Sequence, residues 1–240
     1  MDNSLPSISI IMPAFNEENT VESSTLQNIE TFEKLGIDFE LLIVDDKSVD
    51  RTLELAEALA KKHDKIRCFA HEKNLGPGGA FRTGIDHAIK DYVIFLPFDN
   101  PMDPEDLNQY LPRMGTCDII VGIRAERIGY SPQARFSSFF YNRILIPLFF
   151  NIGISDVNWI QIYRRKIFSD KIIEFADSKI FYLVEILVKA RRSRLIIAEV
   201  PSIMKKRLYG QATCTKLSTI IVTLWDLVRF FIKNQMEPHK

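Results

Sequence analysis

The stretch ELLIVDDKSVDRT (residues 40–52) contains the local signals that decide the fold. Together with Phe39, its apolar run up to Val44 is typical of a buried strand. The run ends at the acidic pair Asp45 and Asp46, and Asp50 stands where it can cap a helix over residues 51–62. A buried strand that leads through a short polar loop into a helix predicts an α/β unit.

The same alternation of strand and helix repeats through the first half of the chain. The predicted strands cover 7–12, 39–44, 66–70, 92–96 and 118–123, and the predicted helices cover 17–35, 51–62 and 77–90. Near-continuous apolar strands that alternate with helices imply an α/β, Rossmann-like fold, with a mostly parallel sheet covered by helices on both faces.

Polar residues stand where the predicted strands end. In a parallel sheet, ligands bind outside the carboxyl ends of the strands, so these residues predict a binding site along one edge. They are Asn16 and Glu17 after the first strand, Asp45 and Asp46 after the second, Asn74 after the third, Asp99 after the fourth and Arg124 after the fifth.

The second half contains two strongly apolar stretches, 135–154 and 217–232, with a predicted helix over 179–190 and a predicted strand over 195–200 between them. Charged residues interrupt both stretches, so neither offers the roughly 18 uncharged residues expected of a membrane-spanning helix. Both suit a membrane interface with their arginines at the headgroups, and packing on the domain or in a dimer is the alternative. We therefore divide the chain into a domain at 1–215, which includes the first stretch, and a C-terminal apolar amphipathic helix and tail at 216–240.

Composition narrows the class of protein. The content of 46% hydrophobic residues excludes global disorder, and three widely spaced cysteines predict neither a disulfide framework nor a metal site. No secretory signal is visible at the N-terminus, so a reducing cytosolic compartment is expected. The net charge is zero, yet residues 1–120 carry 11 Lys and Arg against 22 Asp and Glu, and residues 121–240 carry 20 against 9. This asymmetry indicates an acidic half suited to a metal and a basic half suited to anions, unless it reflects only solvated helix surface.

Four segments in order carry a resemblance to a known family: SIIMPAFNEENTV (9–21), ELLIVDDKSVDRT (40–52), NLGPGGAFRTGI (74–85) and FLPFDNPMDPEDL (95–107). They resemble the motifs of the family 2 glycosyltransferases with a GT-A fold. GIRAERIG (122–129), RFSSFFYN (135–142) and AEVPSIMKKRLYG (198–210) extend the likeness to the polyprenyl-phosphate (dolichyl-phosphate) mannose or glucose synthase branch.

The resemblance implies a nucleotide-sugar site in the first half of the chain. An acidic side chain past a strand end can accept hydrogen bonds from a base or ribose, and we favour Asp45 for this contact. The backbone of the glycine-containing turn suits a diphosphate, although a purely structural role is equally compatible with it. The residues assigned to the donor are Pro13, Phe15, Glu17, Asp45, Asp46, Asn74, Gly76 and Asp99.

A divalent cation, Mg²⁺ or Mn²⁺, is the cofactor that the resemblance implies, because it neutralises the leaving diphosphate and prefers carboxylate oxygens. The family supplies these oxygens from an Asp-x-Asp triplet after the fourth strand. Here the triplet is Pro97-Phe98-Asp99, so the first aspartate is missing. Asp99 is the expected metal ligand, and Asp103 or Asn100 would compensate with a second oxygen.

On the acceptor side, Arg124, Arg135 and Arg207 match family positions whose guanidinium groups face phosphates, and Asp156 lies in the acceptor region. Asp99, Arg124 and Arg135 are the expected catalytic residues. The expected function is inverting transfer of a hexose from a UDP- or GDP-sugar to a polyprenyl phosphate, by a peripheral enzyme on the cytoplasmic side of the membrane.

Two alternatives stay open, a hydroxyl acceptor such as a glycan with Asp156 as base, and a non-catalytic nucleotide-sugar binding protein. The expected partners are the donor, the lipid and the membrane surface, with no nucleic acid; a homo-oligomer is left open.

Overall fold

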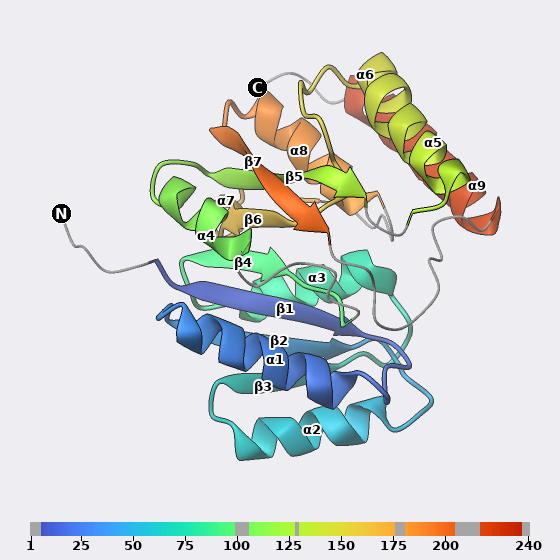
Figure 1. The fold of residues 1–240 in the computed structure, drawn as a ribbon. Coiled ribbons are helices and arrows are strands. Elements are labelled where there is room, and N and C mark those ends of the chain that lie inside the picture. The colour runs from blue at the N-terminus through green and yellow to red at the C-terminus, as the bar shows by residue number, and fades with distance from the viewer. Residues whose placement is uncertain (1–5, 99–105, 128–129, 176–180, 205–216, 237–240) are drawn as a thin grey trace.

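Residues 6–98, 106–127, 130–175, 181–204 and 217–236 are described in the structure, a computed structural model. Within them, seven strands form one sheet in the order β3-β2-β1-β4-β6-β5-β7 (Figure 1). Their bounds are β1 Ile8–Ala14, β2 Phe39–Asp45, β3 Ile66–Ala70, β4 Tyr92–Phe95, β5 Ile119–Arg127, β6 Gln161–Arg164 and β7 Ile197–Met204.

The sheet is mostly parallel, as the sequence predicts, but it contains one antiparallel strand that the sequence analysis missed. Strand β6 pairs antiparallel with both β4 and β5, whereas the other neighbours pair in parallel. The signal was present in the alternation around β6, because Ile160 and Ile162 pack on one face of the sheet and Tyr163 on the other. Because β6 reverses direction between them, the carboxyl ends of β4 and β5 lie at the same edge.

Helices cover both faces of this sheet (Figure 1). Their bounds are α1 Val21–Lys34, α2 Thr52–Lys62, α3 Gly76–His87, α4 Leu107–Tyr110, α5 Pro132–Phe140, α6 Ile146–Phe149, α7 Lys166–Ser169, α8 Tyr182–Arg192 and α9 Leu217–Met236. A single π-helical turn, Tyr141–Leu145, joins α5 to α6.

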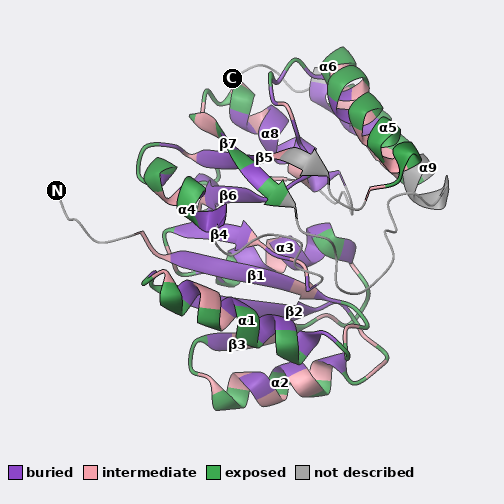
Figure 2. Ribbon diagram, in the orientation of Figure 1, coloured by how far each residue is buried: buried purple, intermediate pink, exposed green. Residues whose placement is uncertain are grey.

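The two faces of the sheet bury separate apolar clusters, because alternate residues of each strand point to opposite sides. On one face Ile10 of β1 packs with Phe32 of α1 and Leu59 of α2. On the other, Ile11 packs with Phe81 of α3, and the cluster extends to α8 and α9. Figure 2 shows the central strands β1, β2, β4 and β6 buried almost throughout, whereas the edge strands β3 and β7 are partly exposed, as are the outer surfaces of the helices.

Several predicted boundaries differ from the structure by a few residues, and three of these differences concern the predicted site. Helix α1 begins at Val21 and not at Glu17, because the loop before it turns through Asn16, whose φ is 57°. Helix α2 begins at Thr52, one residue late. Strand β5 continues to Arg127, so Arg124 lies inside the strand and not after it.

The two apolar stretches of the second half lie side by side as α5–α6 and α9 (Figure 1). One side of this pair is packed: Phe149 contacts Phe231 at 5.2 Å between ring centroids, and Phe150 contacts Phe230 at 5.5 Å. The other side exposes large apolar side chains, among them Phe136, Leu148 and Trp225. In the described part of the chain, no helix combines the length and apolarity needed to cross a membrane.

Candidate nucleotide-sugar site

The ends of β1 and β2 meet at the edge where the sequence predicts a site. Pro13 pairs with Val44 and Ala14 with Asp45 in the parallel register. A proline is tolerated here because β1 pairs with β4 only up to Ile11, so the residue needs no amide hydrogen for that neighbour. The register therefore places Asp45 beside the last residue of β1.

Asp45 carries the clearest indication of a ligand at this edge. Its side chain is buried, with the residue only 1% exposed, and Oδ2 accepts a hydrogen bond from the backbone N–H of Ser48 at 3.1 Å. Oδ1 is also buried and has no hydrogen-bond partner among the described residues. A buried carboxylate oxygen without a donor is costly, so this atom suits an N–H or O–H group of a bound molecule.

The loops after β1 and β2 are fastened to each other around Asp45. The N–H of Asn16 donates to Ser48 Oγ at 3.0 Å, and Asn16 Oδ1 accepts from the N–H of Val49 at 3.0 Å. Phe15, the residue before Asn16, has a half-exposed ring. The Glu17 carboxylate accepts a hydrogen bond from the Thr20 hydroxyl at 2.5 Å. Phe15 and Glu17 thus lie in the loop that follows β1, and their predicted donor contacts stay predictions.

Asp46 binds protein groups and is buried beside Asp45. Its two carboxylate oxygens accept hydrogen bonds from the backbone N–H groups of Leu75 and Gly76, both at 2.7 Å. Its carbonyl oxygen accepts from the Asn74 side chain at 3.1 Å. Gly76 has a φ of 76°, a conformation that favours glycine, and this lets the first turn of α3 approach the carboxylate. The described contacts of Asp46, Asn74 and Gly76 hold the loop in place, and their contact with a donor stays a prediction.

His71, a residue outside the sequence motifs, is part of the same arrangement. Its ring lies 2.8 Å from Asp46 Oδ1 and 2.8 Å from Thr83 Oγ1. No motif or metal spacing marked it in the sequence. The only signal was its position directly after the third predicted strand, at the edge that the other strand ends share.

Arg124 and Asp156, both predicted on the acceptor side, bind each other. The guanidinium donates from Nε and Nη2 to the two carboxylate oxygens, each at 2.7 Å, and from Nη1 to the Tyr130 hydroxyl at 2.9 Å. Their side chains are 5% and 1% exposed. Burial lowers the pKa of Arg124, but the hydrogen bonds and charge of Asp156 outweigh it and the pKa is raised. The guanidinium also lies over the ring of Trp159, at 5.0 Å from its centroid.

A second buried polar chain, which the sequence did not suggest, connects to this region through Trp159. The indole N–H donates to Ser202 Oγ of β7 at 2.6 Å, and the Ser202 hydroxyl donates to Asp106. Asp106 also accepts from the backbone N–H of Ile203 at 3.1 Å. It follows the segment 99–105 directly, so the chain beyond the predicted metal ligands is anchored to β7.

Several predicted residues are not brought into this site by the described contacts. Asp99, Asn100, Asp103 and Arg207 lie outside the described residues. Phe98, just before Asp99, is 3% exposed and its carbonyl oxygen accepts from Ser24 of α1 at 2.5 Å. Arg135 is exposed on α5. Among the side chains that are described, no three His, Cys, Asp or Glu residues gather as a potential metal site.

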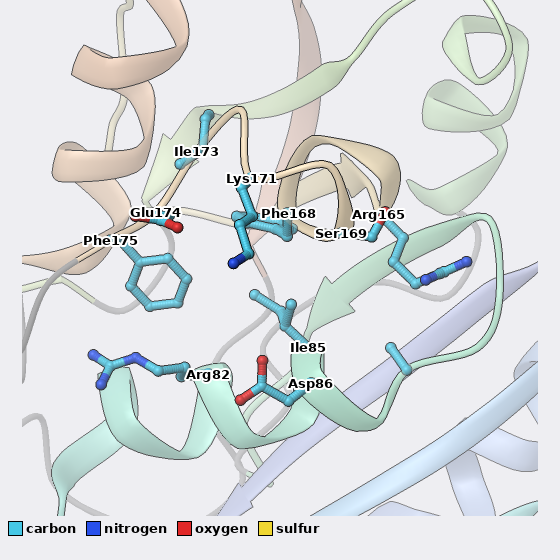
Figure 3. A pocket seen from close by; sticks show the side chains of 11 residues that line it. Arg82, Ile85, Asp86, Arg165, Phe168, Ser169, Lys171, Ile173, Glu174 and Phe175 are labelled. Atoms are coloured by element: carbon cyan, nitrogen blue, oxygen red, sulfur yellow. The ribbon is translucent and has the colours of Figure 1, made fainter.

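A hollow of about 380 Å³ lies elsewhere, between α3 and the segment around α7 (Figure 3). Arg82, Asp86, Lys171 and Phe175 are among its lining residues. Arg165, which also lines it, donates its backbone N–H to the carbonyl of Asp91 just before β4. The hollow is therefore at the opposite edge of the sheet from the carboxyl ends of β1 and β2, and it mixes both signs of charge.

Comparison with known proteins places these features in a family. The model of "Glycosyl transferase family 2" matches residues 9–171. The chain is 30% identical over 202 residues to glycosyltransferase AglD of Haloferax volcanii, covering 81% of this chain and 32% of AglD. It is 30% identical over 122 residues to the undecaprenyl-phosphate 4-deoxy-4-formamido-L-arabinose transferase of Pseudomonas aeruginosa, covering 50% of this chain and 36% of that protein. The chain thus spans about a third of the length of each of these curated relatives.

A solved structure supports the same fold. Glucosyl-3-phosphoglycerate synthase from Mycobacterium tuberculosis, crystallised with Mn²⁺, UDP and phosphoglyceric acid, matches with a TM-score of 0.64 at 18% identity, covering 97% of this chain and 80% of that one. At this identity the likeness speaks for the fold alone, a GT-A arrangement of a mostly parallel sheet with helices. The match of the family model to 9–171, which contain the β1–β4 motifs and the Asp45 site, shows that this chain belongs to glycosyl transferase family 2.

Proposed function

We propose that the protein is an inverting glycosyltransferase that moves a hexose from a UDP- or GDP-sugar to a polyprenyl phosphate at the cytoplasmic face of a membrane. The observation that carries the proposal is the buried Oδ1 of Asp45 at the carboxyl edge of the sheet, which has no partner among the described residues, in a chain of family 2. One relative is named as an undecaprenyl-phosphate transferase, which supports the choice of a lipid phosphate acceptor.

The donor would lie across the ends of β1 and β2. Asp45 Oδ1 would accept a hydrogen bond from the base or ribose, and the exposed ring of Phe15 would pack beside the nucleoside. Pro13 and Glu17 belong to the same strand end and loop. Asp46, Asn74 and Gly76 would hold the floor of this site through the contacts described above.

The chemistry is one in-line displacement at the anomeric carbon. An oxygen of the acceptor phosphate forms the new bond, and the bond from the anomeric carbon to the nucleoside diphosphate breaks with its electron pair leaving on the diphosphate. A phosphate monoester has a second pKa of about 6, so the nucleophile is already anionic near neutral pH and needs no base. Asp99 and Asp103 would hold a Mg²⁺ or Mn²⁺ ion through their carboxylate oxygens, and the ion would neutralise the leaving diphosphate.

The acceptor side favours a phosphate over a hydroxyl. A hydroxyl acceptor would need a carboxylate to take its proton, and Asp156 was the predicted base. Both of its oxygens instead accept from Arg124 in a buried ion pair, so they are engaged by the guanidinium and not directed at an acceptor hydroxyl. We assign Arg124 and Asp156 to shaping the acceptor loop, and Arg135 and Arg207 to binding phosphate oxygens, for which guanidinium groups are suited.

The exposed side of α5–α6 and α9 would rest on the lipid surface. Phe136, Leu148 and Trp225 are each more than two-thirds exposed. Arg135 on α5 and Arg143 in the π-helical turn, and Arg229 and Lys233 on α9, are exposed as well. Apolar side chains at the acyl boundary, with cations at anionic headgroups, are the pattern of an interfacial helix.

The test is transfer of radiolabel from a panel of UDP- and GDP-sugars into polyprenyl phosphate. The folded full chain is assayed with Mn²⁺ or Mg²⁺ and with EDTA, and label is measured in the organic phase. Asp99→Asn serves as the variant expected to lose turnover. We expect EDTA-sensitive label in the lipid. Label found only in a water-soluble glycan would show that the acceptor is a glycan hydroxyl and not a lipid phosphate. Nucleotide binding without any turnover would indicate a binding protein.

A further inference from the structure

The side chain of His71 lies between the end of β2 and helix α3, outside the sequence motifs of the donor site. Its side chain is 9% exposed, and that of its partner Asp46 is 5% exposed. One ring nitrogen, Nδ1, is 2.8 Å from Asp46 Oδ1, and the other, Nε2, is 2.8 Å from Thr83 Oγ1. Both nitrogens therefore have a partner, which is the arrangement of a histidine held in one fixed orientation.

The partners determine where the ring proton lies. A carboxylate only accepts hydrogen bonds, so Nδ1 must carry a hydrogen and donate it to Asp46. In the neutral ring Nε2 is then the acceptor, and the Thr83 hydroxyl donates to it. This defines a directed chain from Thr83 through His71 to Asp46.

The same residue contacts both aspartates that end β2. The backbone N–H of His71 donates to the carbonyl of Asp45 at 2.9 Å, while its ring binds Asp46. Helix α3 is thereby attached to β2 at two points: Asp46 binds the N–H groups of Leu75 and Gly76, and through His71 it is tied to Thr83 farther along the helix.

We propose that His71 is a positioning residue for nucleotide binding, which rests on the donor site proposed above. Its ring fixes the carboxylate of Asp46, and this carboxylate fixes the first turn of α3 against the strand end that presents Asp45. Without the ring, Asp46 is held only by the N–H groups of Leu75 on Oδ1 and Gly76 on Oδ2, which belong to the same turn that it has to position. The loop at the donor site then samples more conformations, and binding must supply the cost of ordering it.

The test compares three variants of the full chain. His71→Ala removes the ring, His71→Asn restores an N–H close to the position of Nδ1, and His87→Ala is the matched control. His87 lies on α3 and bonds the same threonine, but through its backbone carbonyl. Kd values for UDP and GDP with Mn²⁺ are measured by calorimetry well below the melting temperature of every variant.

We expect His71→Ala to weaken nucleotide binding by about tenfold or more, equivalent to losing a charge-assisted hydrogen bond. His71→Asn should recover most of this loss, and His87→Ala should bind like the wild type. A residue that only stabilised the fold would lower the melting temperature without changing Kd at low temperature. Equal Kd values for His71→Ala and the wild type would overturn the proposal.

A second measurement separates this inference from the proposed function. Amide hydrogen exchange at Leu75 and Gly76 is followed by NMR without nucleotide, since both N–H groups bind Asp46. Faster exchange in His71→Ala but not in His87→Ala supports positioning of the loop. If the wild type binds neither UDP nor GDP, the proposed donor site is wrong, and the exchange rates still show whether His71 positions the loop. Unchanged exchange at Leu75 and Gly76 in His71→Ala would overturn that role of His71.

Discussion

Two adjacent aspartates at the end of β2 have different partners in this structure. Asp46 binds the first turn of α3 and the ring of His71, whereas Asp45 keeps one buried carboxylate oxygen without a partner among the described residues. Asp45 is the last residue of β2 and Asp46 the first residue of the loop after it, and their side chains have different surroundings. This separates a residue that holds the loop from a residue that is available to a ligand.

Substitution of Asp45 tests the donor site directly. Asp45→Asn keeps the shape and an oxygen for the N–H of Ser48, but removes the charge and one acceptor. A hydrogen bond to a charged group contributes about 1.5–3 kcal/mol, so affinity for UDP or GDP should fall by about tenfold or more. Isothermal calorimetry measures the effect.

The control is Asp64→Asn, which makes the same chemical change at an exposed loop position between α2 and β3. It should bind nucleotide like the wild type. Equal affinity for the wild type and Asp45→Asn, in protein with an unchanged circular dichroism spectrum, would remove Asp45 from the donor site.

At the scale of the elements, the pair formed by α5–α6 and α9 carries large apolar side chains on both its packed side and its exposed side. Phe149, Phe150 and Phe230 join the pair to the core, whereas the opposite side remains apolar and exposed. Exposed apolar patches of this kind indicate an interaction surface. The cations around it favour anionic lipid as the partner.

Liposome co-sedimentation tests this surface. Replacing Phe136, Leu148 and Trp225 together by Ser should reduce the partition onto vesicles with anionic lipid by about tenfold or more, because each buried side chain of this size contributes about 1.5–3 kcal/mol. For the wild type, a higher salt concentration should also weaken binding to the vesicles, because salt screens the attraction between the cations and the anionic lipid. Ile89→Ser, at a 66% exposed residue after α3, is the control. Unchanged partition of the triple variant would exclude this surface as the lipid contact.

At the scale of the whole molecule, helix α9 belongs to the apolar cluster that Ile11 forms with α3 and α8 on one face of the sheet. Leu227 is 1% exposed and Phe230 is 8% exposed within that cluster. Arg192 of α8 also donates to the carbonyl of Asn234 at 2.8 Å. The division of the chain at residue 215 stays a prediction, and these contacts favour one cooperative unit that includes α9.

Chemical denaturation tests whether α9 unfolds together with the rest of the chain. Phe230→Ala should lower the free energy of unfolding by about 3–5 kcal/mol, because it leaves a cavity in a packed core. The unfolding transition should remain single when followed by both circular dichroism and fluorescence. Trp225→Ala, on the same helix but 68% exposed, should change stability little. Two unfolding transitions in the wild type, of which the first is absent in Phe230→Ala, would show that α9 unfolds on its own.

Local sequence signals were enough to predict every strand of the described sheet except β6, the helices between the first four strands and the edge that bears the polar residues. These features depend on local signals: apolar runs of strand length, helical spacing and polar loops after each strand. The motif around Asp45 and the glycine turn at Gly76 were likewise readable, because both follow a strand within a few residues. The match to family 2 confirmed the resemblance that these motifs carry.

The insertion of β6 between β4 and β5, the pairing of Arg124 with Asp156 and the place of His71 became visible only in the folded chain. The physical reason is the same in each case. Such contacts join residues far apart in the chain, and a carboxylate or imidazole takes its role from the donors that packing brings to it. Local periodicity describes which face a side chain occupies, whereas its partner depends on which other strand end arrives at that face.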